Sequence, residues 1–253
     1  MTIGRWAGWK MQVGLFAAAY LAYSAARWIC IGDLPTAQDH AGWILDVERT
    51  AGLDVEEAVQ EGLTGTPLLG LLNHLYLLAQ LVVVPGALIW LYRHNLGIYR
   101  RLRNTVLATW LISVPIYALF PVAPPRLAGV GMVDTITEQT GVALDSSLTT
   151  SFYNELAAVP SLHAGFAAAV SVALAVALER RWAKLVALSW GPAVALSVVA
   201  TGNHFVFDIA AGLLVTVAGY GLGVCCAWES RRDPAGPIAR RTRFRARAAR
   251  SPA

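Results

Sequence analysis

The sequence predicts an all-α membrane protein with six transmembrane helices, both termini in the cytoplasm and amphipathic helices at the outer face. Of the 253 residues, 56% are hydrophobic and only 14% are charged, whereas soluble domains carry about 25% charged residues. The apolar residues also gather in runs of about 17 residues or more, which is the length that a helix needs to cross a bilayer. We therefore expect one membrane domain over residues 1–228 and a separate tail over residues 229–253.

Six apolar runs account for the predicted spans. The first run follows Arg5 and Lys10 and is longer than the core of a usual signal peptide, so we expect a retained span rather than a cleaved leader. The fourth and fifth runs are short but sufficient. The predicted spans are residues 11–31, 68–91, 105–122, 162–178, 185–201 and 205–227.

Residues 40–63, between the first two spans, predict one or two amphipathic helices with a break near Gly52. Apolar residues such as Trp43, Ile44 and Val47 alternate there with carboxylates. The favoured interpretation is a pair of helices that lie on the outer leaflet. A cap over an active site is the alternative, and it is less favoured because an acidic face repels a phosphate.

The positions of lysine and arginine predict the orientation, because cytoplasmic loops near span ends are rich in them. With both termini inside, the basic clusters at residues 93–103 and 180–184 fall in the cytoplasm. The two long loops, residues 32–67 and 123–161, then face outward and hold most of the acidic residues. This pattern predicts a multi-pass protein of the plasma membrane, with His163 and His204 at the extracytoplasmic surface.

The tail from Glu229 onward combines prolines and a glycine with eight arginines and shows no apolar periodicity. Such a composition predicts disorder. A polybasic segment beside a span sets topology and binds anionic lipids. No nucleic-acid partner is expected, because no folded recognition element accompanies the arginines.

The candidate chemistry begins with His204 and Asp208. On a helix, a spacing of four residues places both side chains on one face, within reach of a hydrogen bond. The carboxylate can fix the tautomer of the imidazole and make its other nitrogen more basic, as an orienting acid does for a nucleophile or base. The alternative is structural: a buried histidine and aspartate that satisfy each other between packed helices.

A second histidine favours the catalytic interpretation. His163 follows Pro160 and Ser161 at the predicted start of the fourth span, at the same outer surface. Unpaired backbone N–H groups at a helix start bind phosphate well. Two histidines, a carboxylate and an anion-binding helix start suit phosphoryl transfer, in which one histidine attacks phosphorus and the other protonates the leaving oxygen.

Two motifs resemble a known family. Pro160-Ser161-Leu162-His163 and the segment 202–208, Gly-Asn-His-Phe-Val-Phe-Asp, resemble the second and third signature motifs of the type 2 phosphatidic acid phosphatase superfamily of membrane lipid phosphatases. The first of these motifs has leucine where other members have glycine. In this respect it resembles the inositol phosphorylceramide synthase branch, which has bacterial members. Residues 99–104 and 121–126 are also similar to those members. The resemblance covers about residues 41–212.

The resemblance implies a role for each matching residue. His204 is the expected nucleophile, Asp208 its orienting partner and His163 the acid for the leaving group, with Ser161 and Asn203 as substrate contacts. The chain departs from the phosphatase pattern where that pattern has a lysine and an arginine. This sequence has Leu119 and Val198 at those positions, so Arg126 is the main cation expected to bind phosphate.

Weaker substrate-binding candidates are Asn73 and Tyr76 in the outer half of the second span and Asp134 in the outer loop. Hydrogen bonding between helices explains the first two equally well. We expect no metal and no other cofactor, because no cluster of cysteine or histidine accompanies the two histidines. Arginine and helix N–H groups can hold the phosphate oxygens without a metal.

These features predict an enzyme that takes a phosphate or phosphorylated headgroup from a lipid phosphate substrate at the extracytoplasmic face, through a phosphohistidine. An alcohol acceptor defines a lipid phosphotransferase, which the branch resemblance favours. Water as acceptor defines a phosphatidic acid or polyprenyl diphosphate phosphatase. Two further alternatives are an ion or proton transporter and a silent membrane scaffold. Clustering of the polar residues at one membrane face, without an inverted repeat, disfavours the transporter.

Overall fold

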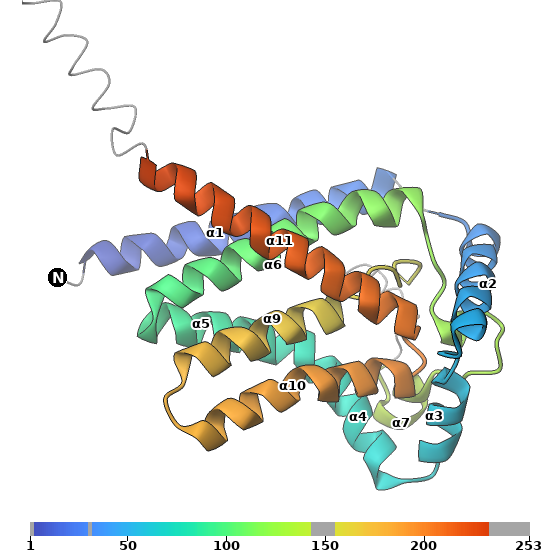
Figure 1. Cartoon of the computed structure of the whole chain (residues 1–253). Helices are drawn as coiled ribbons and strands as arrows, with labels where there is room; N and C mark the ends of the chain where they lie inside the picture. Colours follow the sequence, from blue (N-terminus) through green and yellow to red (C-terminus); the bar gives the residue numbers. More distant parts are fainter. Residues whose placement is uncertain (1–2, 30–31, 143–154, 233–253) are drawn as a thin grey trace, which may run out of the picture.

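Long helices run side by side in a bundle, and short helices gather at one end of it, in the computed structural model shown in Figure 1. The structure describes residues 3–29, 32–142 and 155–232. These residues contain no strand beyond an isolated bridge between Val122 and Ala157, which confirms the all-α class. The helices are α1 (Ile3–Ile29), α2 (Leu34–Ala51), α3 (Glu56–Leu63), α4 (Pro67–Leu78), η1 (Ala79–Val83), α5 (Val84–His94), α6 (Leu96–Leu119), η2 (Pro125–Leu127), α7 (Thr135–Thr140), α9 (Leu162–Ala177), α10 (Arg181–Ala200) and α11 (Val206–Arg232).

Four helical stretches among the described residues are long and apolar enough to cross a membrane, so the chain is a multi-pass membrane protein. A fifth apolar helix, α9, is shorter. The prediction of six spans therefore stays a prediction for residues 11–31 and 162–178. The four stretches are Pro67–His94, Leu96–Leu119, Arg181–Ala200 and Val206–Cys225.

The third predicted span begins earlier than its hydropathy suggests. The Asn95 side chain accepts the N–H of Ile98 at 3.1 Å and caps α6 at Leu96, as asparagine does at many helix starts. The basic residues 100–103 therefore lie in the first turns of α6. The second span is also continuous, because the wide π-helical turn η1 joins α4 to α5 just before Pro85, where a regular helical hydrogen bond is unavailable.

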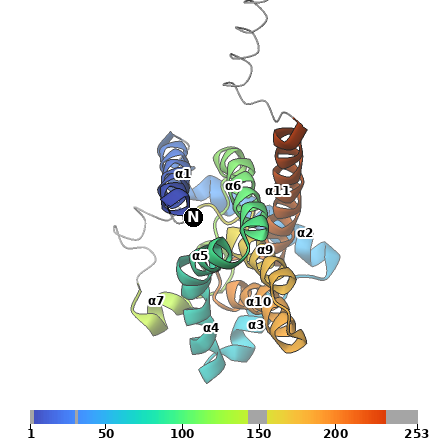
Figure 2. The ribbon, with the colours of Figure 1, turned by 90° about the vertical axis from the view of Figure 1, so that its left-hand side faces the viewer.

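Helix α9 is the centre of the bundle and packs against α5, α6, α10 and α11 (Figure 2). Small residues allow α11 to approach its neighbours closely, as glycine does in many membrane helix pairs. A Cβ at Gly212 would overlap the backbone of Ser161, and a Cβ at Gly219 would lie 2.9 Å from the backbone nitrogen of Thr109. The segment just before α9 is thereby fixed against α11.

Helices α2, α3 and α7 lie at the end of the bundle opposite to the start of α1 and the end of α11 (Figure 1). The predicted break at Gly52 is confirmed, because this residue ends α2 in the left-handed conformation, with φ of 68°. Trp43 and Val47 are exposed, which is compatible with helices that lie on the outer leaflet. The face that packs inward consists of Ala37, Ala41, Ile44 and Glu48.

Contacts of α2 show why this face is buried. His40 contacts the carbonyl of Pro121 through Nδ1 at 2.7 Å and stacks on Phe120, which follows α6. Ile44 packs in one apolar cluster with Val122 and Phe205. Helix α2 thus covers the end of the bundle, as the less favoured cap interpretation expects. The tail prediction falls on residues 229–253, of which α11 includes 229–232 and the remainder lies outside the described residues.

Candidate active site

A tight turn between α10 and α11 carries His204. Gly202 adopts a φ of 69°, which glycine tolerates without steric cost. The N–H groups of Asn203 and His204 both donate to the carbonyl of Val198 at 3.1 Å. Since α11 begins at Val206, His204 precedes the helix instead of lying on it, which corrects the helical i,i+4 interpretation. The four-residue spacing still brings the two side chains together, because Asp208 folds back to cap the helix.

Asp208 holds the histidine directly. One of its carboxylate oxygens, Oδ2, lies 3.2 Å from Nδ1 of His204 and accepts the backbone N–H of Phe205 at 2.9 Å. Nδ1 must carry the hydrogen in this contact, because its partner is a carboxylate oxygen. The lone pair of the imidazole is therefore on Nε2, the nitrogen that Asp208 does not engage.

The charge state of His204 follows from its surroundings. Burial lowers the pKa of its imidazole to about 3, a shift that the Ala158 carbonyl opposes and the nearby charge of Arg126 reinforces. A buried cation without full compensation is costly, so the ring is neutral at pH 7. A neutral imidazole with a free lone pair can act as a nucleophile.

His163 lies across from His204 in the first turn of α9. The centroids of the two imidazole rings are 6.0 Å apart. Tyr76 of α4 stacks on His163 with a ring separation of 4.2 Å and fixes its orientation. Ser161 caps α9 by accepting the N–H of Ala164 at 3.3 Å, and its own N–H donates to the backbone carbonyl of Asp208 at 3.0 Å. The two motifs are thus joined by a backbone hydrogen bond.

Arg126 enters the site from η2, and its side chain is only 1% exposed. Its backbone N–H donates to Gly202 at 2.9 Å, and its Nε donates to Oδ1 of Asn203 at 3.2 Å. The guanidinium also pairs with Asp134 at 3.6 Å and with Glu155 at 3.8 Å. Arg126 is therefore positioned beside the His204 turn and is already balanced by two carboxylates.

Three predicted substrate contacts have structural partners in the free protein. Asn73 accepts from the Thr135 hydroxyl at 2.8 Å and donates to the Thr135 carbonyl and the Gln139 side chain, so its amide holds α7 against α4. Asp134 caps α7 in addition to pairing with Arg126. Tyr76 stacks on His163. These contacts fit the interhelical alternative for Asn73, and a substrate role for any of the three stays a prediction.

The structure also brings polar residues to the site that sequence reasoning missed. Gln60 of α3 joins three segments, since it accepts from Val133 N–H at 3.0 Å and donates to the carbonyls of Val133 and Ala200. Glu48 of α2 accepts the backbone N–H of Phe207. Its sequence signal is that it is a carboxylate on the same side of the helix as the apolar residues Ala41 and Ile44. No sequence signal marks Glu155, whose importance follows from its pairing with Arg126.

The two positions where the phosphatase pattern has cations carry none here. Leu119 is 83% exposed at the end of α6, and Val198 is fully buried in an apolar cluster. No group of three or more histidine, cysteine, aspartate or glutamate side chains in the described part of the chain could hold a metal ion. Among the described residues, Arg126 and the polar groups of the two motifs are positioned where they could hold a phosphate.

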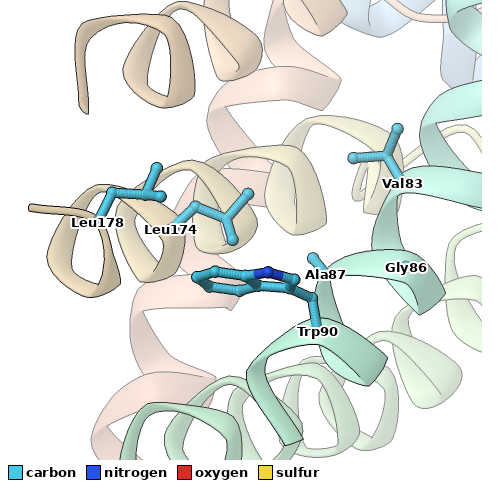
Figure 3. Close-up of a pocket in the computed structure, with 6 residues that line it drawn as sticks. All are labelled: Val83, Gly86, Ala87, Trp90, Leu174 and Leu178. Atoms are coloured by element: carbon cyan, nitrogen blue, oxygen red, sulfur yellow. The ribbon is translucent and has the colours of Figure 1, made fainter. Parts of the chain in front are cut away.

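An apolar groove of about 380 Å³ lies elsewhere, between α5 and α9 (Figure 3). Leu174 and Leu178 line it, whereas His163 is at the other end of α9. Trp90 forms its floor together with small residues of α5. With apolar side chains throughout, the groove fits a lipid-facing surface and contributes nothing to the polar site.

Fold and site together define a multi-pass helical membrane protein with two histidines, of which His204 is buried, close together at one end of its bundle. A family model described as the PAP2 superfamily matches residues 42–222, and the chain belongs to this superfamily of membrane phosphatases. Membership of the superfamily is thereby confirmed, whereas the inositol phosphorylceramide synthase branch stays a prediction. The solved structure of LpxE from Aquifex aeolicus has the same fold, with a TM-score of 0.51 and 14% sequence identity over 68% of this chain and 93% of that chain. No curated protein matches the sequence significantly.

Proposed function

We propose that the protein is a lipid phosphotransferase or phosphatase that acts at the extracytoplasmic face of the plasma membrane through a phosphohistidine on His204. The observation that carries this proposal is the pair of facing imidazoles 6.0 Å apart, one of them hydrogen-bonded to a buried carboxylate. In-line phosphoryl transfer needs a nucleophile and an acid on opposite sides of phosphorus. Membership of the PAP2 superfamily supports the same chemistry.

The proposed reaction has two steps. Nε2 of His204 attacks phosphorus, the N–P bond forms as the bond to the lipid oxygen breaks, and His163 gives its proton to that oxygen. The negative phosphate favours the protonated form of His163 before the step. In the second step, His163 takes a proton from the acceptor hydroxyl, which attacks phosphorus and releases His204. Arg126 stabilises the charge on the equatorial oxygens in both steps.

The acceptor in the second step is proposed to be an alcohol. The resemblance to the inositol phosphorylceramide synthase branch supports transfer, as does the absence of cations at Leu119 and Val198. Asp134 and Glu155 add support, because they are partly exposed carboxylates beside Arg126 and can accept hydrogen bonds from hydroxyl groups. A water acceptor gives the alternative activity, a phosphatidic acid or polyprenyl diphosphate phosphatase, which the superfamily membership favours.

The extracytoplasmic location rests on the distribution of charge. Arg100, Arg101 and Arg103 lie at the start of α6, while the residue after the other end of this helix, Phe120, stacks on His40 of α2 beside the site. The arginine cluster and the site are therefore at opposite ends of the bundle. Lysine and arginine favour the cytoplasmic side, which supports an outer location for the site.

A single comparison tests the proposal. Purified protein and the His204→Ala variant are incubated with labelled phosphatidylinositol, phosphatidic acid and polyprenyl diphosphate, each with and without alcohol acceptors. We expect acid-labile label on the native protein, none on the variant, and inhibition by vanadate, which mimics the transition state on a histidine. Turnover that survives His204→Ala contradicts the enzymatic proposal. Free phosphate as sole product from every donor contradicts transfer and supports the phosphatase alternative.

Ion flux separates the enzyme from the transporter alternative. The same protein is reconstituted in vesicles, and proton or ion flux is recorded at several pH values. The enzymatic proposal predicts no flux that depends on His204. A pH-dependent flux that persists when lipid turnover has been abolished favours the transporter.

A further inference from the structure

The first turn of α11 is capped by three carboxylates. A helix start leaves backbone N–H groups without helical partners, and negative charge there is favourable. Two of the three carboxylates come from helices far away in the sequence, α2 and α3. The contacts are Phe205 N–H to Asp208 Oδ2 at 2.9 Å, Val206 N–H to Glu56 Oε1 at 2.8 Å, and Phe207 N–H to Glu48 Oε1 at 2.6 Å.

Both distant carboxyls are deeply buried. Glu48 is 2% exposed at the end of the inward stripe of α2, and Glu56 is 3% exposed in the first turn of α3. Burial of a carboxyl is unfavourable unless it is hydrogen-bonded. Neither residue contacts the histidines in the described structure, so their position is explained by the turn that they hold. That turn follows His204 directly in the sequence.

We propose that Glu48 and Glu56 are positioning residues, a pair of buried carboxyl groups that locks the start of α11 so that His204 faces His163. The inference rests on the proposed function, because it assigns the two glutamates to the geometry of the nucleophile. If the first turn of α11 moves, His204 and Asp208 move with it. Reactions that depend on near-attack geometry lose about 10²-fold when a reacting group shifts by about 1 Å.

Protonation of Glu48 gives the pair a measurable signature. Burial raises the pKa of Glu48 to about 8, the Phe207 N–H opposes the shift, and the Glu56 carboxyl raises it further, as does Asp208. These are the ionisable groups that act on Glu48 from α3 and α11, and the neighbouring His204 is neutral. Below about pH 8 Glu48 keeps its proton. Above it, two adjacent carboxylates repel each other and loosen the cap.

Matched variants of Glu48 test the inference. Glu48→Gln keeps an oxygen acceptor for Phe207 and cannot ionise, so we expect kcat at pH 7 within twofold of the native value. In the native protein we expect kcat to decrease above about pH 8. In Glu48→Gln we expect the same decrease at a pH at least one unit higher. Glu48→Ala removes the acceptor, and we expect kcat at pH 7 to fall 10- to 100-fold, with KM changed less than twofold because Glu48 does not touch substrate. Glu61→Gln is the charge-matched control, because Glu61 is an exposed residue on α3. It should leave kcat at pH 7 and the alkaline decrease of kcat unchanged.

Two outcomes overturn the inference. One is a decrease of kcat at alkaline pH in Glu48→Gln that occurs at the same pH as in the native protein. The other is native kcat in Glu48→Ala. If Glu48→Ala does not fold, as judged by its elution and thermal unfolding in detergent, the pH profile of Glu48→Gln decides alone. Failure of the proposed function is seen separately, as turnover that survives His204→Ala.

Discussion

Replacement of Asp208 by asparagine is the sharpest test of the catalytic pair. The carboxylate accepts two hydrogen bonds through one oxygen, from His204 at 3.2 Å and from Phe205 at 2.9 Å, and it is fully buried. Asparagine is nearly the same size and can keep an oxygen toward Phe205. It removes the negative charge that faces Nδ1, or it presents an amide N–H there and forces the opposite tautomer.

The expected loss can be worked from these contacts. Breaking a buried charge pair by neutralising one partner costs about 3 to 5 kcal/mol, and the developing positive charge on a phosphorylated imidazole is such a partner. Each 1.36 kcal/mol corresponds to a factor of ten in rate. Asp208→Asn should therefore lower kcat about 10²- to 10⁴-fold, with a smaller change in KM.

The assay is the initial rate of lipid phosphate turnover in detergent micelles, with His204→Ala as the background. Asp46→Asn is the control, because Asp46 is an exposed residue of α2 whose partner is Arg49. Thermal unfolding of each variant shows that the bundle is retained. A rate for Asp208→Asn within tenfold of the native rate, in a protein whose His204→Ala variant is inactive, refutes the orienting role of the carboxylate.

Three further perturbations probe the phosphate cation, the helix packing and the buried histidine. Arg126→Lys should lower kcat/KM about 10- to 100-fold, because an ammonium group cannot bond Asn203 while spanning two carboxylates; unchanged steady-state kinetics contradict its assignment. Gly212→Ala should lower the unfolding temperature and activity together, since its Cβ overlaps Ser161, whereas Gly221→Ala in the same helix meets nothing within 4 Å and should change neither. Burial lowers the pKa of His204 to about 3, so between pH 3 and 6.5 the unfolded chain binds a proton that the native protein does not, and stability is lost as pH falls through this range. His204→Gln should therefore flatten the unfolding temperature between pH 4 and 6.5, and an unaltered acid slope contradicts a buried neutral imidazole.

Local patterns in the sequence were enough to predict the motifs and most of the spans. Runs of apolar residues predict the membrane-spanning stretches of α4 to α6, α10 and α11. The four-residue spacing predicts the contact between His204 and Asp208, although His204 lies in a turn. Hydropathy does not indicate which side of α2 packs against the bundle. Small residues such as Ala37 and Ala41 allow close packing and are buried, whereas the larger apolar side chains of Trp43 and Val47 are exposed.

Contacts across the sequence account for the residues that were missed. Glu48 and Glu56 contact α11 across sequence separations of 159 and 150 residues, and no local pattern encodes such a pairing. The prediction also treated the carboxylates of residues 40–63 as charges facing a phosphate. Two of them face a helix start instead, where the partial positive charge of backbone N–H groups favours them.

The capped helix start has a consequence for where the phosphate can bind. Two helices, α9 and α11, begin at the site, and each start is by itself suitable for an anion. The start of α11 is occupied by the carboxyl groups of Asp208, Glu56 and Glu48, and the negative charge in this group repels a phosphate. The start of α9 is capped by the neutral hydroxyl of Ser161 and keeps its positive dipole. In the proposed reaction, we therefore expect the phosphate at the start of α9 and Arg126, between His163 and His204. The acidic cap makes the two otherwise similar helix starts unequal. This supports the proposed reaction, in which the turn before α11 carries the nucleophile His204 and the start of α9 binds the anion and carries the acid His163.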